Sequence, residues 1–95
     1  MPGYTYIMAS RKQGTLYIGV TADLPERTAQ HRRGEGSAFT RRYKCHRLVW
    51  YEEFASVDDA IACEKRMKDW KRAWKVEAIE KRNPDWFDLS RWLHA

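Results

Sequence analysis

Two segments rich in aromatic and β-branched residues constrain the fold of this 95-residue chain more than any other feature. Residues 4–9 and residues 15–20 each have the composition of a β-strand. Only a short polar loop containing Gly14 joins them, so the two strands are predicted to pair as an antiparallel hairpin. A hairpin cannot bury an apolar face by itself, and the rest of the chain must therefore cover it with helices.

The residues after the hairpin carry the signals of a first helix. Asp23 is a favourable N-cap, and Glu26 completes a capping-box pattern. The helix is predicted to run to about Arg33 and to stop at Gly34. The basic stretch of residues 38–46 gives no clear signal for a helix or a strand.

A third strand and two further helices follow. Residues 48–54 are predicted to form the strand, and Ser56 begins a helix that continues to about Lys71. Another helix is expected over residues 72–81. The tail, residues 84–95, is so aromatic that it is expected to fold back onto the core. The chain is therefore predicted to be one α+β domain of order β-β-α-β-α-α, a small three-stranded antiparallel sheet flanked by helices.

The chain is basic, because 18 Lys and Arg residues outnumber 13 Asp and Glu residues and give a formal net charge of +5. A basic surface on a small domain favours a polyanionic partner, nucleic acid first and an anionic membrane second. A solvated surface that merely happens to be basic accounts for the charge equally well.

The chain carries no signal for export or membrane insertion. No apolar run approaches the roughly 20 residues of a membrane-spanning helix, and the N-terminal residues do not resemble a signal peptide. Cys45 and Cys63 are too few for a disulfide framework, and their spacing matches no familiar zinc site. These features predict a cytoplasmic protein with free thiols and no membrane partner.

One carboxylate falls on an apolar helix face. Glu64 lies at the centre of the stripe formed by Val57, Ala60, Ile61 and Met67. A carboxylate that faces a core costs several kcal/mol unless it is paired, hydrogen-bonded or bound to a metal. The two interpretations are a structural ion pair with a nearby Arg or Lys and a metal ligand.

Four further polar or aromatic residues are predicted to face the same interior. Arg27 and His31 lie four residues apart on the face of the first helix that also carries Leu24. Tyr6 and Tyr17 lie one on each strand of the hairpin. Each has an ordinary interpretation as a surface Arg–His pair or as half-buried strand tyrosines.

Taken together, these five residues suit phosphodiester hydrolysis. A glutamate can hold a divalent cation that neutralises the scissile phosphate and the leaving oxygen. An arginine offers a planar fork that matches phosphate oxygens. A tyrosine or histidine can take the proton of the attacking water. Because the reference pKa of tyrosine is near 10, a tyrosine base needs nearby cations that favour the phenolate.

The ordered set of these residues resembles the GIY-YIG nuclease domain over about residues 3–81. The resemblance is carried by two strand motifs and three separate side chains: Tyr4–Tyr6, Tyr17–Gly19, Arg27, His31 and Glu64. The stretches Thr40–Tyr43 and Val49–Glu52 are similar to those of the small stand-alone bacterial branch of the family. The resemblance implies a central three-stranded antiparallel sheet and divalent-metal-dependent DNA cleavage, a chemistry used in DNA repair.

The resemblance also implies a role for each residue. Tyr6 is the leading candidate for general base, and Tyr17 positions the water and the scissile phosphate. Arg27 binds the phosphate, and His31 supports the tyrosine or shares in proton transfer. Glu64 is the single carboxylate that binds the metal, which is expected to be Mg²⁺ or Mn²⁺.

The sequence departs from the family pattern in two places. Tyr4 stands where the first motif has its glycine, a residue that takes no chemical part in the mechanism. Asn83 is the only asparagine that could match the late asparagine of many members, and it lies beyond the expected helices. The chain has no appended specificity domain, so selectivity is expected to come from the domain itself or from a protein partner.

Basic residues in the middle of the chain and on the last helices are predicted to bind nucleic acid through its phosphates. They are Arg32, Arg33, Arg41, Arg42, Lys44, Lys68 and Lys71. Trp70 and Trp74 are expected to pack against the aromatic tail, and Phe39 is a candidate for base contact. Two alternatives remain: a non-catalytic basic nucleic-acid-binding module, and an interaction module that offers its tail to a partner.

Overall fold

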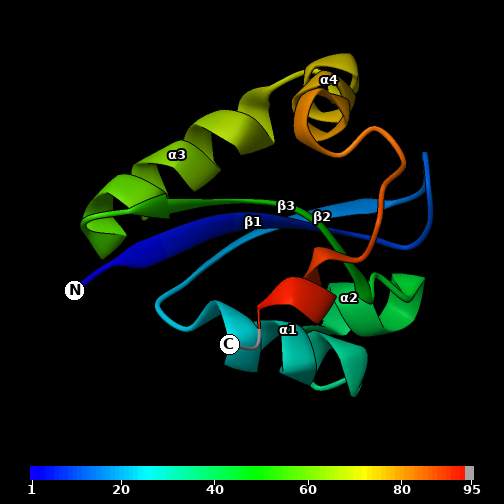
Figure 1. The fold of residues 1–95 in the computed structure, drawn as a ribbon, viewed down its shortest axis with the longest axis horizontal. Helices are drawn as coiled ribbons and strands as arrows, with labels where there is room; N and C mark the ends of the chain where they lie inside the picture. Colours follow the sequence, from blue (N-terminus) through cyan, green and yellow to red (C-terminus); the bar gives the residue numbers. More distant parts are fainter. Residues whose placement is uncertain (94–95) are drawn as a thin grey trace.

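The structure is a computed structural model that describes residues 1–93. The elements follow one another as β1 (Gly3–Ala9), β2 (Leu16–Thr21), α1 (Leu24–Arg32), α2 (Ala38–Tyr43), β3 (Arg47–Phe54), α3 (Val57–Asp69), α4 (Arg72–Arg82) and the 3₁₀ helix η1 (Leu89–Trp92) (Figure 1). The predicted order of strands and long helices is confirmed, and α2 and η1 are additions to it. His94 and Ala95, the end of the predicted tail, lie outside the described residues.

The three strands form one antiparallel sheet in the order β2-β1-β3, as predicted. The central strand β1 pairs along its length with both neighbours, so Tyr6 lies opposite Gly19 on one side and Tyr51 on the other. The β1–β3 register shifts between Ile7 and Met8. Because β1 has a strand on each side and helices above and below, five consecutive side chains from Thr5 to Ala9 are buried.

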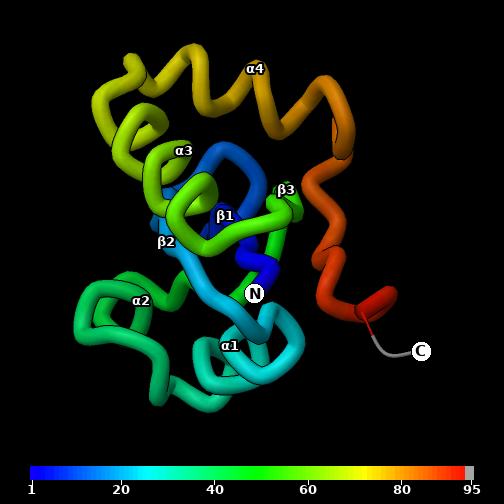
Figure 2. Tube along the Cα trace, turned by 90° about the vertical axis from the view of Figure 1, so that its left-hand side faces the viewer, coloured from blue at the N-terminus to red at the C-terminus, as the bar shows by residue number. Residues whose placement is uncertain are grey.

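The sheet lies between two helical layers. Helices α3 and α4 cover one face and helices α1 and α2 cover the other, while the C-terminal segment runs alongside β3 (Figure 2). Side chains alternate along β1, so Ile7 and Ala9 enter the core cluster under α3 and α4, whereas Tyr6 and Met8 enter the cluster that contains Leu24 of α1. This alternation determines that the Tyr6 ring faces the first helix.

The two cysteines lie in different core clusters. Cys63 is in the cluster beneath α3 and α4, and Cys45 is in the cluster on the α1 side of the sheet. Both are buried free thiols. The sheet separates them, which is consistent with the prediction of free thiols.

Side chains at the helix starts account for where the helices begin. The Asp23 side chain accepts the backbone N–H of Glu26 and begins α1, and Ser56 does the same for α3. The short helix α2 begins with a reciprocal capping box between Ser37 and Thr40. The longest helix, α3, has 13 residues, and none of the helices within residues 1–93 has the length and hydropathy to cross a membrane.

Asn83 anchors the C-terminal segment. Its side-chain amide donates to the carbonyls of Val49 and Phe87, and its Oδ1 accepts the N–H of Phe87. The next turn places Trp86 in the core, where its side chain is fully buried. The Asn83 side chain is 4% exposed. Its hydrogen bonds join α4, β3 and the C-terminal segment.

Candidate active site

The centre of the site is a buried hydrogen bond between the sheet and the first helix. Tyr6 Oη lies 2.9 Å from Nε2 of His31, and both side chains are at most 1% exposed. Burial raises the pKa of Tyr6 well above its ordinary value, and the neighbouring Tyr17 adds to the shift. At neutral pH Tyr6 is therefore a phenol that donates a hydrogen bond.

Both ring nitrogens of His31 have a hydrogen-bond partner, and the roles of donor and acceptor depend on the tautomer. On the far side of the ring, Nδ1 lies 3.0 Å from Oγ1 of Thr40, and that hydroxyl donates its single proton to the carbonyl of Ser37 at 3.1 Å. With the hydroxyl proton on the Ser37 carbonyl, Thr40 Oγ1 accepts from His31 Nδ1–H. The lone pair of Nε2 is left facing the hydroxyl of Tyr6, which has no other hydrogen-bond partner within residues 1–93.

His31 is neutral over most of the pH range. Burial first, and then the positive charges of Arg27 and His46, lower the pKa of His31 to about 4. His46 also donates a 2.7 Å hydrogen bond from its Nδ1 to the backbone carbonyl of His31. The neutral imidazole can therefore accept a proton from Tyr6.

Arg27 lies one turn before His31 on α1 and is half-buried. Its charge lowers the pKa of Tyr6 and the pKa of His31, so the guanidinium acts on both partners of the hydrogen bond. No carboxylate within residues 1–93 forms an ion pair with it. This guanidinium is therefore available for an external anion such as a phosphate.

Tyr17 connects the buried pair to an open groove along the edge strand β2. Its ring centroid lies 5.5 Å from that of His31 and 5.9 Å from that of Phe39. The groove has a volume of about 270 Å³ and is lined by β2, by Phe39 of α2 and by two lysines, Lys68 and Lys75. It is therefore aromatic on one side and cationic on the other.

Glu64 lies beside the buried stripe of α3 rather than at its centre. The buried positions of α3 are Ala60, Cys63 and Met67, so the predicted central placement of Glu64 is wrong. The Glu64 side chain is 16% exposed and forms a 3.2 Å ion pair with Lys68, one turn further on. Its negative charge also raises the pKa of Tyr6, which places the carboxylate in the electrostatic environment of the site.

Glu64 is the single carboxylate of the site that could bind a metal ion. Within residues 1–93 there is no group of three or more His, Cys, Asp or Glu side chains that could hold an ion by themselves. Mg²⁺ keeps several waters and is commonly bound by one or two carboxylates together with substrate phosphates. Glu64 and Arg27 both act on the pKa of Tyr6, and one carboxylate of this kind fits a cation that the protein shares with a phosphate.

Two glycines allow the Tyr6–His31 pair to form. A Cβ atom on Gly19 would lie 2.5 Å from the hydroxyl oxygen of Tyr6, and one on Gly36 would overlap the ring of His31. Glycine is therefore required at position 19 of the second strand motif for a steric reason, because the Tyr6 ring occupies the space that a side chain would fill. Gly36 brings the loop before α2 against the imidazole in the same way.

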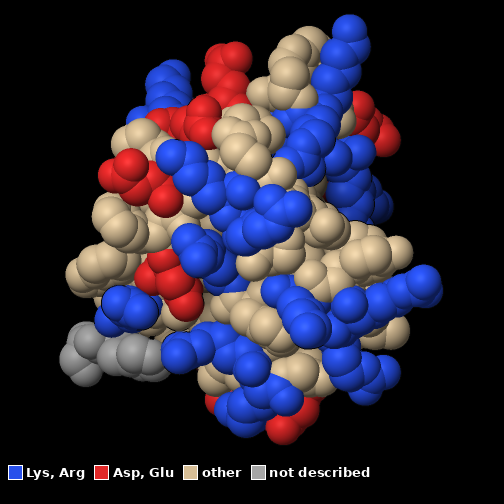
Figure 3. Space-filling model, turned by 90° about the vertical axis from the view of Figure 1, so that its right-hand side faces the viewer, with Lys and Arg blue, Asp and Glu red and all other residues tan. Residues whose placement is uncertain are grey.

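The predicted nucleic-acid-binding residues are all exposed, but they do not form one cluster with the site. Arg33 forms ion pairs with Glu26 of α1 and with Glu35 in the loop that follows α1. Lys68 lines the groove, whereas Lys71 is the N-cap of α4. Arg32 is on α1, Arg41 and Arg42 are on α2, and Lys44 is the C-cap of α2. On the side of the molecule drawn in Figure 3, basic side chains gather across the middle of the surface.

The aromatic residues divide into core and surface groups. Trp70 is half-buried against the core cluster that contains Trp86, whereas Trp74 is 55% exposed. The predicted packing against the tail is therefore wrong for Trp74. Phe39 is 42% exposed and stacks with Tyr43, with ring centroids 4.7 Å apart, so the proposed base contact has an accessible ring.

Sequence reasoning missed three residues that the structure brings to the site. Thr40 orients His31, His46 supports its backbone, and Lys75 lines the groove beside Lys68. Thr40 and His46 lie in the stretch that has no clear periodic pattern. The capping pair Ser37–Thr40 was the available signal, although it lacks the acidic residue that usually marks a capping box.

The family model of the GIY-YIG catalytic domain matches residues 2–77. The chain belongs to the GIY-YIG family. The family consists of nucleases, which act on nucleic acid and in general use divalent metal ions.

Bacterial relatives support the same placement. The UPF0213 protein of Streptococcus pneumoniae serotype 4 is 36% identical over 76 residues, which cover 80% of this chain and 76% of that protein. The UPF0213 protein of Bacillus pumilus is 36% identical over 77 residues, or 81% and 78% of the two chains. The solution NMR structure of a UPF0213 protein from Bacillus halodurans matches with a TM-score of 0.58 and 27% identity over 100% of both chains. The resemblance and the α+β fold predicted from the sequence are thus confirmed.

Substitution of Gly19 tests the steric account of the motif. Gly19→Ala is expected to displace Tyr6 and to lower the free energy of unfolding by roughly 1–3 kcal/mol, the usual cost of overpacking. Urea denaturation followed by tryptophan fluorescence measures the change. Gly34→Asn is the matched control, because Gly34 has φ 78° and nothing within 4 Å of its Cβ position, and asparagine tolerates that conformation. Equal stability of Gly19→Ala and the wild type would contradict the account.

The lowered pKa of His31 predicts how stability depends on pH. The unfolded chain binds a proton at the ordinary pKa near 6.5, whereas the folded chain does so only at about 4. Stability is therefore complete above pH 6.5 and falls by roughly 2–3 kcal/mol as the pH drops toward 4. Urea midpoints measured between pH 5 and pH 7.5 should show this slope for the wild type and a flatter profile for His31→Asn. A wild-type midpoint that does not change over this range would refute the buried neutral imidazole.

Proposed function

We propose that this chain is a divalent-metal-dependent DNA endonuclease. The observation that carries the proposal is the 2.9 Å hydrogen bond between Tyr6 Oη and Nε2 of the neutral His31 ring, beside the unpaired charge of Arg27. This arrangement gives a proton acceptor and a phosphate-binding cation at one place, which is what hydrolysis of a phosphodiester requires. Membership in a nuclease family supports the same chemistry.

Arg27 and the groove would position the substrate. The Arg27 guanidinium binds the two non-bridging oxygens of the scissile phosphate, and Lys68 and Lys75 attract the flanking backbone. Tyr17 lies between the groove and the buried pair, so its hydroxyl holds the attacking water near the phosphorus. The aromatic rings of Tyr17 and Phe39 present a face to the neighbouring base.

Tyr6 and His31 would activate the water together. As the water oxygen attacks phosphorus in line with the leaving oxygen, Tyr6 takes the proton of the water and passes its own proton to Nε2 of His31. Arg27 favours the phenolate character that Tyr6 gains in this step. Thr40 keeps Nε2 free by accepting the proton on Nδ1. The reaction needs no covalent intermediate.

Glu64 would hold the divalent cation, Mg²⁺ or Mn²⁺, together with the substrate phosphate. The bound ion supplies positive charge that stabilises the leaving oxygen. In the absence of an ion, the ammonium group of Lys68 neutralises the carboxylate at 3.2 Å. The ion pair considered from the sequence is therefore present.

Cleavage of labelled DNA tests the function directly. Glu64→Gln and Arg27→Ala are each expected to lower the rate with Mg²⁺ by at least about 100-fold, because each removes charge stabilisation from the transition state. Tyr6→Phe removes the proton acceptor and is expected to have an effect of the same order. Chelation of the metal should abolish cleavage by the wild type.

Glu53→Gln and Arg66→Ala are the matched controls, since both side chains are exposed and neither lies at the site. They should cleave at the wild-type rate, and Glu64→Gln and Arg27→Ala should unfold at temperatures similar to the wild type. Wild-type cleavage by Glu64→Gln and Arg27→Ala would overturn the proposal. DNA binding without any metal-dependent product would favour the non-catalytic basic module instead.

A further inference from the structure

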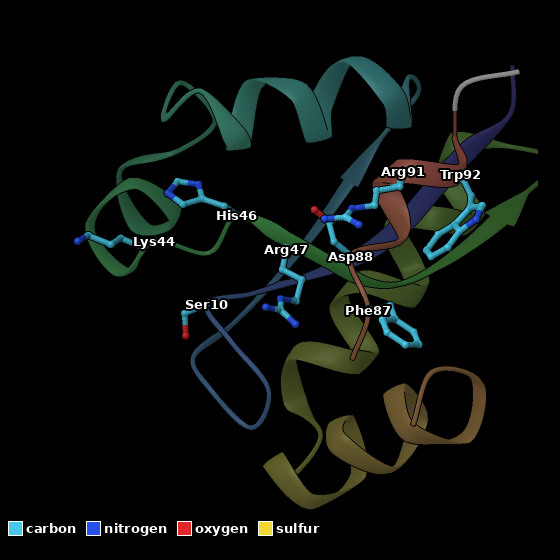
Figure 4. Close-up of a pocket in the computed structure, with 8 residues that line it drawn as sticks. All are labelled: Ser10, Lys44, His46, Arg47, Phe87, Asp88, Arg91 and Trp92. Carbon is cyan, nitrogen blue, oxygen red and sulfur yellow. The ribbon is translucent and has the colours of Figure 1, made fainter. Parts of the chain in front are cut away.

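A second cavity lies away from the groove, between the end of α2, the start of β3 and the C-terminal segment. Its volume is about 470 Å³, larger than that of the groove, and the two share no lining residue. Figure 4 shows the side chains of Arg47 and Arg91 in the middle of the cavity, with Trp92 and Phe87 on one side and Lys44 on the other. None of these five residues takes part in the chemistry proposed above.

The cavity is cationic, and most of its positive charge is unpaired. Neither Lys44 nor Arg91 forms an ion pair within the part of the chain that the structure describes. Arg47 donates one hydrogen bond from Nη1 to the backbone carbonyl of Trp86, which holds the guanidinium in place and leaves its other donors free. Such a cluster favours an anion that offers several oxygens.

One carboxylate, Asp88, also lines the cavity, and it has a structural role. Its Oδ1 accepts the backbone N–H groups of Leu48 and Ser90 and the hydroxyl of Ser90. It therefore ties η1 to the start of β3. These hydrogen bonds fix the position of the segment that carries Arg91 and Trp92.

Two large aromatic side chains border the same cations and are open to solvent. Phe87 is 56% exposed and Trp92 is 68% exposed. Exposed rings next to unpaired Arg and Lys side chains are the combination that proteins use for unpaired nucleotides, because bases stack on the rings while phosphates bind the cations. A duplex backbone would use the cations but would leave the rings without a partner.

The cavity is linked to the candidate active site through one residue. His46 lines the cavity and donates to the backbone carbonyl of His31. A strand held in the cavity would therefore lie against a residue that is hydrogen-bonded to α1.

We infer that this cavity binds a single-stranded segment of the nucleic-acid substrate, with phosphates on Arg47, Arg91 and Lys44 and a base stacked on Trp92 or Phe87. The inference rests on the proposed function for its substrate, and it narrows that substrate to nucleic acid that contains unpaired nucleotides. The cavity is a binding site and takes no part in the cleavage step.

The test compares binding of a fluorescein-labelled oligo-dT strand and a labelled duplex, measured by fluorescence anisotropy with chelator present. In the double variant Arg91→Ala/Trp92→Ala, affinity for the single strand should fall at least about tenfold, since each stacked base contributes roughly 1–3 kcal/mol. Affinity for the duplex should fall less than about threefold. The slope of log affinity against log salt should also decrease by about one for the lost phosphate contact.

The double variant Trp74→Ala/Lys81→Ala is the matched control, because it removes an exposed tryptophan and a lysine from another surface cavity that Glu77 also lines. It should bind both probes as the wild type does. Equal loss of single-strand and duplex binding in Arg91→Ala/Trp92→Ala, no loss at all, or the same loss in the control would overturn the inference. Failure of the wild type to bind oligo-dT would also overturn the inference. In that case, cleavage of duplex DNA with Mg²⁺ would show that the proposed endonuclease function is correct without the proposed single-strand site.

Discussion

The buried hydrogen bond between Tyr6 and His31 is the interaction on which the arrangement of the site depends. It joins the central strand to the first helix across the interior of the protein, with both side chains almost fully shielded from water. The strand alternation directs Tyr6 to that side, and Gly19 gives its ring room to lie across β2. Thr40 forms a hydrogen bond with the other ring nitrogen of His31, Nδ1. Each of these features follows from the need to satisfy two polar groups in a core.

Burial gives the pair its chemical character. It raises the pKa of Tyr6 and lowers the pKa of His31 to about 4, so the pair rests as a neutral phenol and a neutral imidazole. Arg27 lowers both pKa values and so disfavours a proton on His31 while it stands unpaired. A phosphate bound to Arg27 would offset that charge and make proton transfer to His31 easier.

The fold could be read from the sequence because its signals are local. Strand composition, the short hairpin loop and the capping residues Asp23 and Ser56 each specify an element by themselves. Helix α2 escaped prediction because it is only six residues long and has one buried position, Thr40. For the same reason Thr40 could not be placed behind His31, since that contact depends on how the loop through Gly36 folds. The position of Glu64 was misjudged because Cys63 is buried and moves the centre of the apolar stripe of α3 away from Glu64.

The protonation state of His31 tests the central claim most directly. Long-range ¹H–¹⁵N NMR correlations of the histidine rings distinguish the two neutral tautomers from the imidazolium. The hydrogen bonds of Thr40 predict a neutral ring at pH 7 with the proton on Nδ1. In Thr40→Val, which lacks this hydroxyl, the ring is expected to be a mixture of the two neutral tautomers. A ring that carries its proton on Nε2, or both protons at pH 7, would contradict the account, because Tyr6 would then have no acceptor for its proton.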